Sequence, residues 1–422
     1  MKTRIKPFKT AAVALAVALA LSAGASADPA YDSLKGEVES LKQQLEKLQE
    51  TLKDYEETIA SKQDIVKLEK KVAEADEWKS PNTLIHMSGY ADVGYTDSKD
   101  SDGSFNVGSF SPIFHFQYRD LVMLESELEF EVEPDGETNT ALEYLTVDLF
   151  LNDYMILVAG KFLSPVGQFR QNLHPSWINK FPSAPPGFGH DGAAPVSDLG
   201  VQLRGGFPIG RMRSNYAIYV SNGPELNAFT DDGVNFELEG INAEGFGGDS
   251  DGRKVFGGRF GLLPVAGLEI GLSGATGKAA VSSLENELTG TTTSLSGESR
   301  RDYDVYGFDF AWQHKAINVR GEFVKSKIGS ASGGTTPSSG ARWNTWYTQA
   351  AYRFLPTKIE GVVRYTDFDT PHANEDQKQW ALGVNYLFAS NVIGKFAYEF
   401  NDGVKDSRAD DDRWLFQLAY GF

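Results

Sequence analysis

Cysteine is absent from the chain, which has 422 residues. Its absence excludes a disulfide framework, a thiolate nucleophile and a cysteine-ligated metal site. Histidine is scarce as well: the six residues are scattered, with no pair at the spacing that binds a metal on a helix. No Gly-x-Ser-x-Gly nucleophile turn occurs either. The sequence therefore predicts no catalytic residues, no metal site and no cofactor.

Positive charge is in deficit, with 40 Lys and Arg against 58 Asp and Glu, and the formal net charge is −18. This balance argues against nucleic-acid binding, which needs a basic footprint. Two short acidic segments, 100–103 and 249–252, resemble calcium loops but lack the glutamate at the twelfth position of an EF-hand. We interpret them as solvated acidic loops, with bound surface cations as the alternative.

Long apolar runs are also missing. Residues 1–27 combine a basic start, an apolar stretch over 11–21 and small residues at 25–27, a pattern typical of a secretory signal peptide. The apolar stretch is too short to span a membrane, and no later run reaches the roughly 18 apolar residues of a transmembrane helix. An exported chain that spans a membrane without helices must form a closed barrel.

Residues 28–80 are predicted to form a periplasmic coiled coil. Apolar residues recur there at alternating spacings of four and three, the a/d heptad pattern, at Leu34, Val38, Leu41, Leu45, Leu48, Leu52, Tyr55 and Ile59. The phase breaks near Ser61, where a second short helix is expected to begin. The alternative is one amphipathic helix packed on its own chain, although the apolar stripe is narrower than such packing favours.

Residues 81–422 alternate between apolar and polar side chains, as expected where successive strand residues point to opposite faces. In 122–132 apolar residues alternate with glutamates, and in 413–422 large apolar residues occupy every second position. Segments of about ten residues with this pattern are typical of membrane-spanning barrel strands. Sixteen are predicted, at 84–96, 114–118, 122–132, 142–151, 155–162, 198–207, 215–221, 255–263, 268–276, 303–314, 317–325, 345–354, 359–366, 379–388, 392–400 and 413–422.

The predicted connections alternate between short turns and long loops, beginning with a long loop at 97–109. Short turns at one end and long loops at the other are typical of outer-membrane barrels. The predicted fold is therefore all-β, a 16-stranded antiparallel transmembrane β-barrel preceded by a short N-terminal α-helical coiled coil. A barrel of sixteen strands leaves an aqueous channel.

Charged side chains of the polar parity are predicted to face this channel, because Arg or Lys facing mid-bilayer lipid costs about 2–4 kcal/mol. Rings of charge set ion preference in pores, so the acidic third strand predicts a transverse field and a mild preference for cations. The alternative is a solvated lumen with weak selectivity. The predicted pore-lining residues are Glu125, Glu127, Glu129, Glu131, Lys161, Arg204 and Arg259.

The connection 163–197 is long and rich in proline and aromatic residues. Such a loop is expected to be ordered and functional rather than disordered. We predict that it folds into the barrel and narrows the pore; the alternative is packing over the rim or against a neighbouring subunit. The predicted constriction residues are Arg170, His174, Lys180, His190 and Asp191.

In segment 158–167 a Gly160-Lys161-Phe162 sequence is followed by a proline and a glycine, and segment 87–92 reads Met-Ser-Gly-Tyr-Ala-Asp. With the signal peptide, the coiled coil, the sixteen strands and the terminal Phe422, these motifs resemble the phosphate-selective porin O/P-like family of Gram-negative outer membranes. The resemblance implies a homotrimer with a passive, substrate-filtering channel. It also implies a pore lined by arginine and lysine, from which the glutamates of the third strand depart.

These patterns predict an outer-membrane porin for small hydrophilic solutes or ions, with its coiled coil in the periplasm. Outer-membrane lipids and lipopolysaccharide are its expected surroundings. One alternative is a structural tether whose coiled coil binds a periplasmic or cell-wall partner. Another is a surface hydrolase, which the spacing of Ser, His and acidic residues does not support.

The heptad generates the first prediction. The native protein should be an SDS-resistant oligomer that migrates as a monomer after boiling. Replacing Leu41, Leu45 and Leu48 together with glutamine should weaken assembly without unfolding the barrel, because it removes apolar knobs from the helix seam. Sedimentation in mild detergent measures the oligomer, and a monomeric wild-type protein would contradict the prediction.

Overall fold

The computed structural model describes residues 29–58, 83–99, 101–133, 135–189, 193–230, 232–233, 235–242, 249, 251–333, 337–372, 375–405 and 407–422. The predicted signal peptide at 1–27 lies outside the described residues, as do His190 and Asp191. The chain divides into two units, Met1–Ser80 and Pro81–Phe422. Each unit is described by itself below.

The first unit contains helix α2 (Pro29–Thr58). The heptad leucines Leu41, Leu45 and Leu48 are each more than 60 % exposed, so no described residue of the first unit covers them. The helix agrees with the sequence analysis, whereas its pairing into a coiled coil stays a prediction. Ile59 and the second predicted helix lie outside the described residues. Across the described chain, no helix combines the length and apolar character needed to cross a membrane.

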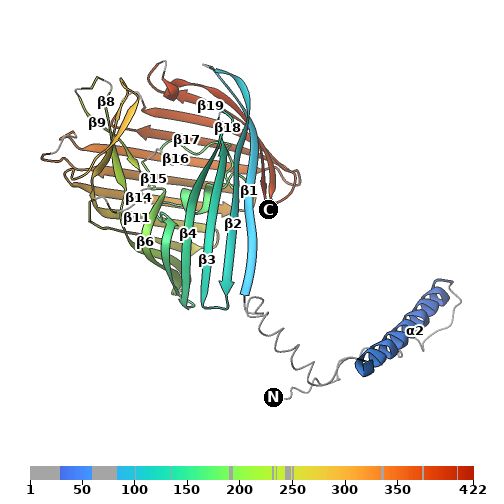
Figure 1. Cartoon of the computed structure of the whole chain (residues 1–422). Helices are drawn as coiled ribbons and strands as arrows, with labels where there is room; N and C mark the ends of the chain where they lie inside the picture. Colours follow the sequence, from blue (N-terminus) through green and yellow to red (C-terminus); the bar gives the residue numbers. More distant parts are fainter. Residues whose placement is uncertain are drawn as a thin grey trace. The chain divides into compact units, whose positions relative to one another are not determined.

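The second unit is a closed antiparallel barrel of sixteen strands, as predicted (Figure 1). Neighbouring strands pair in chain order, and the last strand pairs with the first, with Ala91 opposite Tyr420. The strands are β1 (Thr83–Ser98), β2 (Ser101–Tyr118), β3 (Val122–Val132), β4 (Thr138–Asn152), β5 (Met155–Leu163), β6 (Ser197–Ile209), β7 (Met212–Ser221), β10 (Val255–Val265), β11 (Leu268–Ala279), β14 (Arg301–His314), β15 (Ile317–Ile328), β16 (Ala341–Arg353), β17 (Ile359–Asp369), β18 (Gln377–Leu387), β19 (Val392–Asp402) and β20 (Arg413–Gly421).

One predicted connection is wrong. The long loop expected at 97–109 is mostly strand, because β2 begins at Ser101 and pairs with β1 up to Ser98. The alternation of short and long connections therefore has an exception at the first hairpin. The error has a physical cause: a register shift opposite Ala91 and Val93 puts the exposed Phe105 and Val107 on the other sequence parity from Phe110 and Phe116. The alternation is broken there, while the ladder is held by backbone groups that every residue carries.

Alternate strand residues separate into an exposed outer face and a buried inner face. On β20, Trp414 and Phe416 are each 47 % exposed, whereas Leu415 and Ala419 are buried. Aromatic rings gather on the outer face, where Trp414 stacks on Phe396 with ring centroids 5.3 Å apart. This division puts the large apolar side chains outside and most charged strand residues inside.

A second sheet is built from the two long connections that follow β7 and β11. It has the order β13-β12-β8-β9, with β8 (Glu225–Thr230), β9 (Glu237–Asn242), β12 (Val281–Asn286) and β13 (Thr291–Ser294). Its apolar side chains, including Leu226 and Leu238, share one buried cluster with Tyr303 of β14 and Trp343 of β16. The sheet therefore packs against the ends of the barrel strands that carry the long connections.

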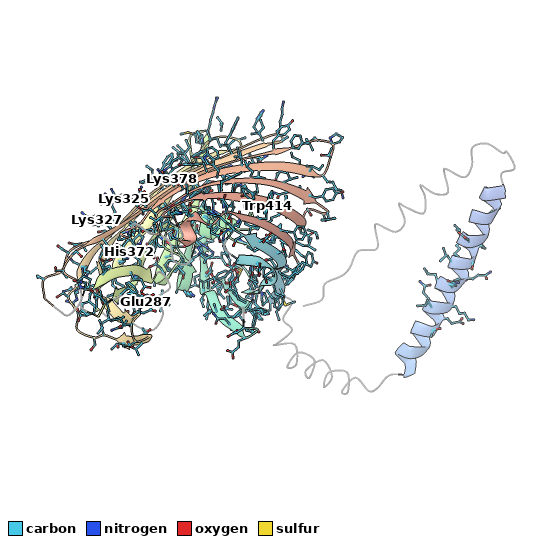
Figure 2. The ribbon with its side chains drawn as sticks, turned by 90° about the horizontal axis from the view of Figure 1, so that it is seen from above. Glu287, Lys325, Lys327, His372, Lys378 and Trp414 are labelled. Carbon is cyan, nitrogen blue, oxygen red and sulfur yellow. The ribbon has the colours of Figure 1, made fainter. Side chains whose placement is uncertain are left out.

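One loop side chain joins the barrel to this sheet. His372, between β17 and β18, lies 3.0 Å from a carboxylate oxygen of Glu237 and 2.9 Å from the carbonyl oxygen of Leu238. Figure 2, which views the barrel from above, shows Lys325, Lys327 and Lys378 along one side of the rim and His372 nearby. The connection between β17 and β18 therefore contacts the small sheet through this histidine.

The outer face generates a second prediction. Leu382 lies at the middle of β18, is 49 % exposed, and stands between Trp380 and Tyr386 on the same face. Leu382→Arg should lower the unfolding free energy in lipid vesicles by about 2–4 kcal/mol, because it places a cation against hydrocarbon. Denaturant titration measures this difference.

Leu288→Arg is the matched control, since Leu288 is 68 % exposed in the turn between β12 and β13. The control should change the unfolding free energy little. Equal effects of the two substitutions would contradict a lipid-facing outer wall.

Candidate functional site

The loop at 164–196 leaves the wall after β5 and returns at β6, two strands that are direct neighbours. Between these points it contains a short π-helical turn, η1 (Phe169–Leu173), and touches inner-face residues of strands β15 to β20 on the other side of the ring. The loop therefore crosses the barrel interior. Three sets of contacts hold it there.

The first set is centred on Glu322 of β15. Its carboxylate accepts hydrogen bonds from the backbone N–H groups of Gln168 (2.8 Å) and Phe169 (3.2 Å), and from the hydroxyl of Tyr347 (2.7 Å). These bonds satisfy loop donors that the turn leaves without helical partners. Bonds to a charged acceptor contribute about 1.5–3 kcal/mol each when buried.

The second set uses wall cations. Arg364 of β17 donates to the carbonyl of Ser183 (3.1 Å) and to its hydroxyl (3.0 Å). Lys395 of β19 donates to the carbonyl of Phe181 (3.2 Å) and to that of Ser176. Both cations are 1 % exposed, and a buried charge needs partners. Besides these loop carbonyls, Arg364 has the carboxylate of Glu399 at 3.5 Å and Lys395 has the side-chain oxygen of Gln417 at 2.7 Å.

A buried acidic group completes this second set. Glu399 of β19 is 3.5 Å from Arg364 and 2.6 Å from Arg413, and it also accepts from the hydroxyl of Ser183. On the neighbouring part of the wall, Glu360 of β17 pairs with Lys180 of the loop at 2.7 Å. The charges facing the interior from β17 and β19 therefore bind the loop and one another.

The third set is apolar. Phe181 of the loop is fully buried among small and branched wall residues, and the guanidinium of Arg364 lies 4.7 Å from its ring centroid. Burial of such a ring contributes about 1.5–3 kcal/mol. The wall residues around it are Ala351, Val362, Ala381, Ala397 and Leu415. These residues come from five neighbouring strands, β16 to β20, which together leave room for one loop side chain and so fix the position of the loop.

The loop also lies close to the backbone of β20, at Gly421. A Cβ atom built on Gly421 would lie 2.7 Å from the ring of Trp177. Glycine at this position lets the loop indole lie directly against the backbone of the closing strand.

The structure places the predicted constriction residues as follows. Arg170 is buried in η1, and its carbonyl oxygen is hydrogen-bonded to Nδ1 of His174. Nε2 of His174 lies 3.7 Å from a carboxylate oxygen of Glu127, which is on β3. Lys180 faces the opposite wall in its pair with Glu360. His190 and Asp191 lie outside the described residues.

The predicted acidic ladder lies on β3. Glu127 is 1 % exposed and accepts a hydrogen bond from the Tyr90 hydroxyl at 2.7 Å. Glu125 lies 3.3 Å from His115 and 3.5 Å from the hydroxyl of Tyr144. Glu129 is partly buried, whereas Glu131, near the end of the strand, is exposed.

The predicted basic residues lie on β5, β6 and β10, and each of them has a polar or acidic partner. Lys161 is buried and donates to the carbonyl of Leu142. Arg204 lies 2.5 Å from Asp148. Arg259 contacts Asp309 (2.6 Å), Glu269 (3.0 Å) and the side-chain oxygen of Asn215 (2.8 Å).

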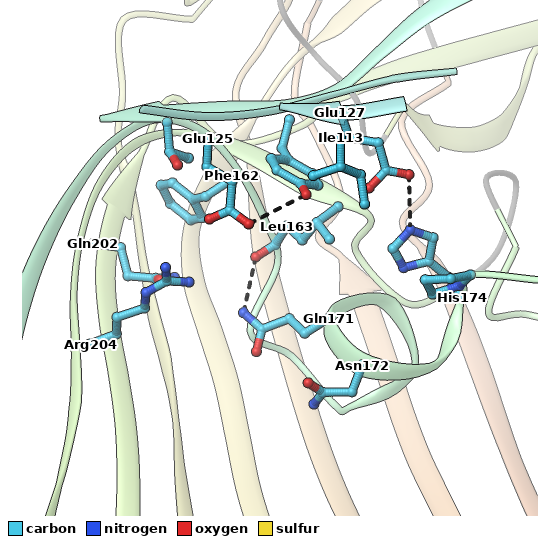
Figure 3. A pocket seen from close by; sticks show the side chains of 13 residues that line it. Ile113, Glu125, Glu127, Phe162, Leu163, Gln171, Asn172, His174, Gln202 and Arg204 are labelled. Atoms are coloured by element: carbon cyan, nitrogen blue, oxygen red, sulfur yellow. Dashed lines mark hydrogen bonds and ion pairs between the residues drawn. The ribbon is translucent and has the colours of Figure 1, made fainter. Parts of the chain in front are cut away.

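Two cavities remain between the loop and the wall formed by β2 to β11. One has a volume of about 260 Å³ and is lined by Glu125, Glu127 and residues of η1 (Figure 3). The other has a volume of about 380 Å³ and is lined by Arg259 and Glu269. Gln171, Asn172 and Arg204 line both, so the cavities adjoin along the free side of the loop. Open space in the interior therefore lies on the side with the acidic ladder.

Part of the cavity lining is neutral and was not among the predicted site residues, which are all charged or histidine. Gln171, Asn172 and Gln202 line the first cavity. Gln202 has the same strand parity as Arg204, so alternation along 198–207 contained the signal. No sequence pattern indicated which wall charges bind the loop. Among the described residues, no group of three or more His, Asp or Glu is placed to hold a metal.

No protein-family model matches the chain, and a comparison with curated proteins found no match. Solved structures do match its fold. They include an anion-selective porin from Comamonas acidovorans (TM-score 0.52, 13 % identity, 81 % of this chain and 100 % of that chain). The trimer form of OmpT, an outer membrane protein of Vibrio cholerae, matches with a TM-score of 0.52 and 13 % identity, over 81 % of this chain and 99 % of that chain. The outer membrane channel DcaP of Acinetobacter baumannii matches with a TM-score of 0.52 and 10 % identity, over 81 % of this chain and 98 % of that chain. At these identities the likeness shows the fold.

The anchored loop generates a third prediction. Lys395→Met keeps the length of the side chain but leaves the carbonyls of Ser176 and Phe181 without their charged donor. Unsatisfied buried groups of this kind cost about 1–3 kcal/mol. The variant should lose that much unfolding free energy, and limited proteolysis should cut the loop sooner than in the wild-type protein.

The matched control is Lys358→Met. Lys358 is an exposed lysine that donates to the carbonyl of Phe388 in a short turn, away from the loop. Its replacement should leave cleavage of the loop unchanged. Equal protease resistance of wild type and Lys395→Met would contradict the anchoring role.

Proposed function

We propose that the chain is an outer-membrane porin, a channel for passive diffusion of small hydrophilic solutes or ions. The observation that carries this proposal is the loop inside a closed sixteen-stranded barrel, with adjoining cavities of about 260 and 380 Å³ along its free side. Sixteen strands enclose more interior than side chains fill. Polar and charged side chains line both cavities, which suits water and hydrophilic solutes.

The charges beside the cavities favour cations over anions. Glu125 and Glu127 line the first cavity, while Arg204 is held by Asp148. In the second cavity, Arg259 is shared between two carboxylates. The cationic groups are therefore compensated locally, whereas the partners of Glu125 and Glu127 are histidine and tyrosine side chains rather than Arg or Lys. The implication of phosphate selectivity from the family resemblance gains no support from this arrangement, and the likeness to an anion-selective porin concerns the fold.

The remaining parts of the proposal concern location and assembly. We propose that the chain is exported to the outer membrane. The order of its segments agrees with this: a signal peptide at 1–27, a periplasmic coiled coil at 28–80 and an outer-membrane barrel. One similar structure is described as a trimer form, which supports a homotrimer for this chain. Lipopolysaccharide and outer-membrane lipids are its proposed surroundings.

Two other functions have less support. The tether alternative depends on the exposed heptad of α2, which also serves a homotrimer. A barrel enzyme would need a constellation of reacting groups, whereas the titratable groups beside the cavities engage in ion pairs and hydrogen bonds that position the loop and the wall. We therefore propose a channel without enzymatic activity.

Ion selectivity provides a fourth prediction. Full-length protein in planar bilayers should show stepwise ion conduction, with a reversal potential under a salt gradient that leans toward cations. Changing Glu125, Glu127, Glu129 and Glu131 together to glutamine should shift that potential toward anions, because it removes four negative charges from one side of the pore. Absence of conducting steps would remove the porin proposal. A strongly anion-selective wild type, or block by micromolar phosphate, would instead restore the function implied by the family resemblance.

A further inference from the structure

The smaller cavity contains an unsatisfied amide. Gln202 of β6 is 1 % exposed, and neither its side-chain oxygen nor its side-chain nitrogen has a hydrogen-bond partner among the described residues. A buried amide without partners costs free energy. Because Gln202 lines the cavity of about 260 Å³, a solute there lies beside this amide and is the partner nearest at hand for it.

More neutral groups face the same space. Gln171 and Asn172, from η1, line the cavity opposite the wall, as Figure 3 shows. An amide offers both a donor and an acceptor, and so does a hydroxyl group, which makes the two complementary. Phe162 and Ile113 supply apolar lining beside these amides. The combination suits a compact solute with several hydroxyl groups and apolar C–H faces.

The charged lining adds one requirement. Glu125 reaches the cavity with a side chain that is 23 % exposed, and its neighbours are a histidine and the hydroxyl of Tyr144. A tyrosine hydroxyl is a neutral donor and leaves the negative charge in place. Glu127 is already occupied by Tyr90 and His174, and Arg204 is held by Asp148. Glu125 is therefore the group best placed to receive a cation.

We infer that this cavity is a binding subsite for a small hydroxylated ammonium compound of the size of one amino sugar. The ammonium group binds Glu125, and the hydroxyl groups bind Gln202, Gln171 and Asn172. This inference rests on the proposed channel function, because the solute reaches the cavity by diffusing into the barrel. It adds a class of solute to that function.

The test uses the full-length chain in planar bilayers with glucosamine as the probe, near neutral pH, where an amine of this kind is mostly protonated. Glucosamine should block the ion current transiently. N-acetylglucosamine and glucose, which lack the charge, should block roughly tenfold more weakly, since a hydrogen bond to a charged group contributes about 1.5–3 kcal/mol. Equal block by all three sugars would overturn the inference, and so would no block by glucosamine.

Variants locate the site. Glu125→Gln and Gln202→Leu should each weaken the block by glucosamine, by roughly tenfold for Glu125→Gln. Glu131→Gln is the matched control, because it makes the same change on the same strand at a residue outside the cavity lining. Equal weakening by Glu131→Gln would show a general field effect and overturn the subsite. Conduction without selective block rejects the subsite and retains the channel, whereas absence of conduction rejects the channel itself.

Discussion

Closure of the ring is the constraint on which the rest of the structure depends. The backbone of β1 pairs with that of β20, and Gly89 and Phe422 exchange two hydrogen bonds of 3.0 and 2.9 Å. Closure gives the first and last strands partners, so the sheet keeps its backbone groups satisfied without water on its outer side. It also creates an interior, and every long connection must then lie inside it or above it. In this chain the loop after β5 lies inside the barrel, and the small sheet lies at the end of the barrel that carries the long connections.

The interior is divided between two kinds of environment. On the side of β15 to β20, buried charges such as Arg364, Lys395 and Glu399 are compensated by the loop and resemble the polar core of a soluble protein. Burying one such charged group alone costs free energy. The groups are stable in the interior only when each has its hydrogen-bond or ion-pair partners. On the side of β3, the carboxylates face open cavities. One wall therefore fixes the loop, and the open cavities lie against the opposite wall.

The sequence predicted the barrel well because strand alternation is a local property. The pattern fails at β2, where a register shift changes the parity of the exposed side chains between Val107 and Phe110 and the ladder depends on backbone groups. The site was less predictable, because alternation tells which face a residue occupies but not what it meets. Arg364 and Glu125 share the same prediction of facing inward, yet one is buried against Ser183 and the other lines a cavity. That distinction depends on the path of the loop, which is fixed by contacts between residues more than 150 positions apart.

The long sequence separation of those contacts has a consequence for how the protein is made. The loop is synthesised before the strands that anchor it, so Gln168, Phe181 and Ser183 lack their wall partners until β15 to β19 follow. Contacts of this kind carry a large loop-closure cost and form late in folding. The pairing of β1 with β20 then encloses the loop together with its partners. The apolar rings of Trp177, Phe181 and Phe188 therefore stay without their wall contacts until the later half of the barrel is available.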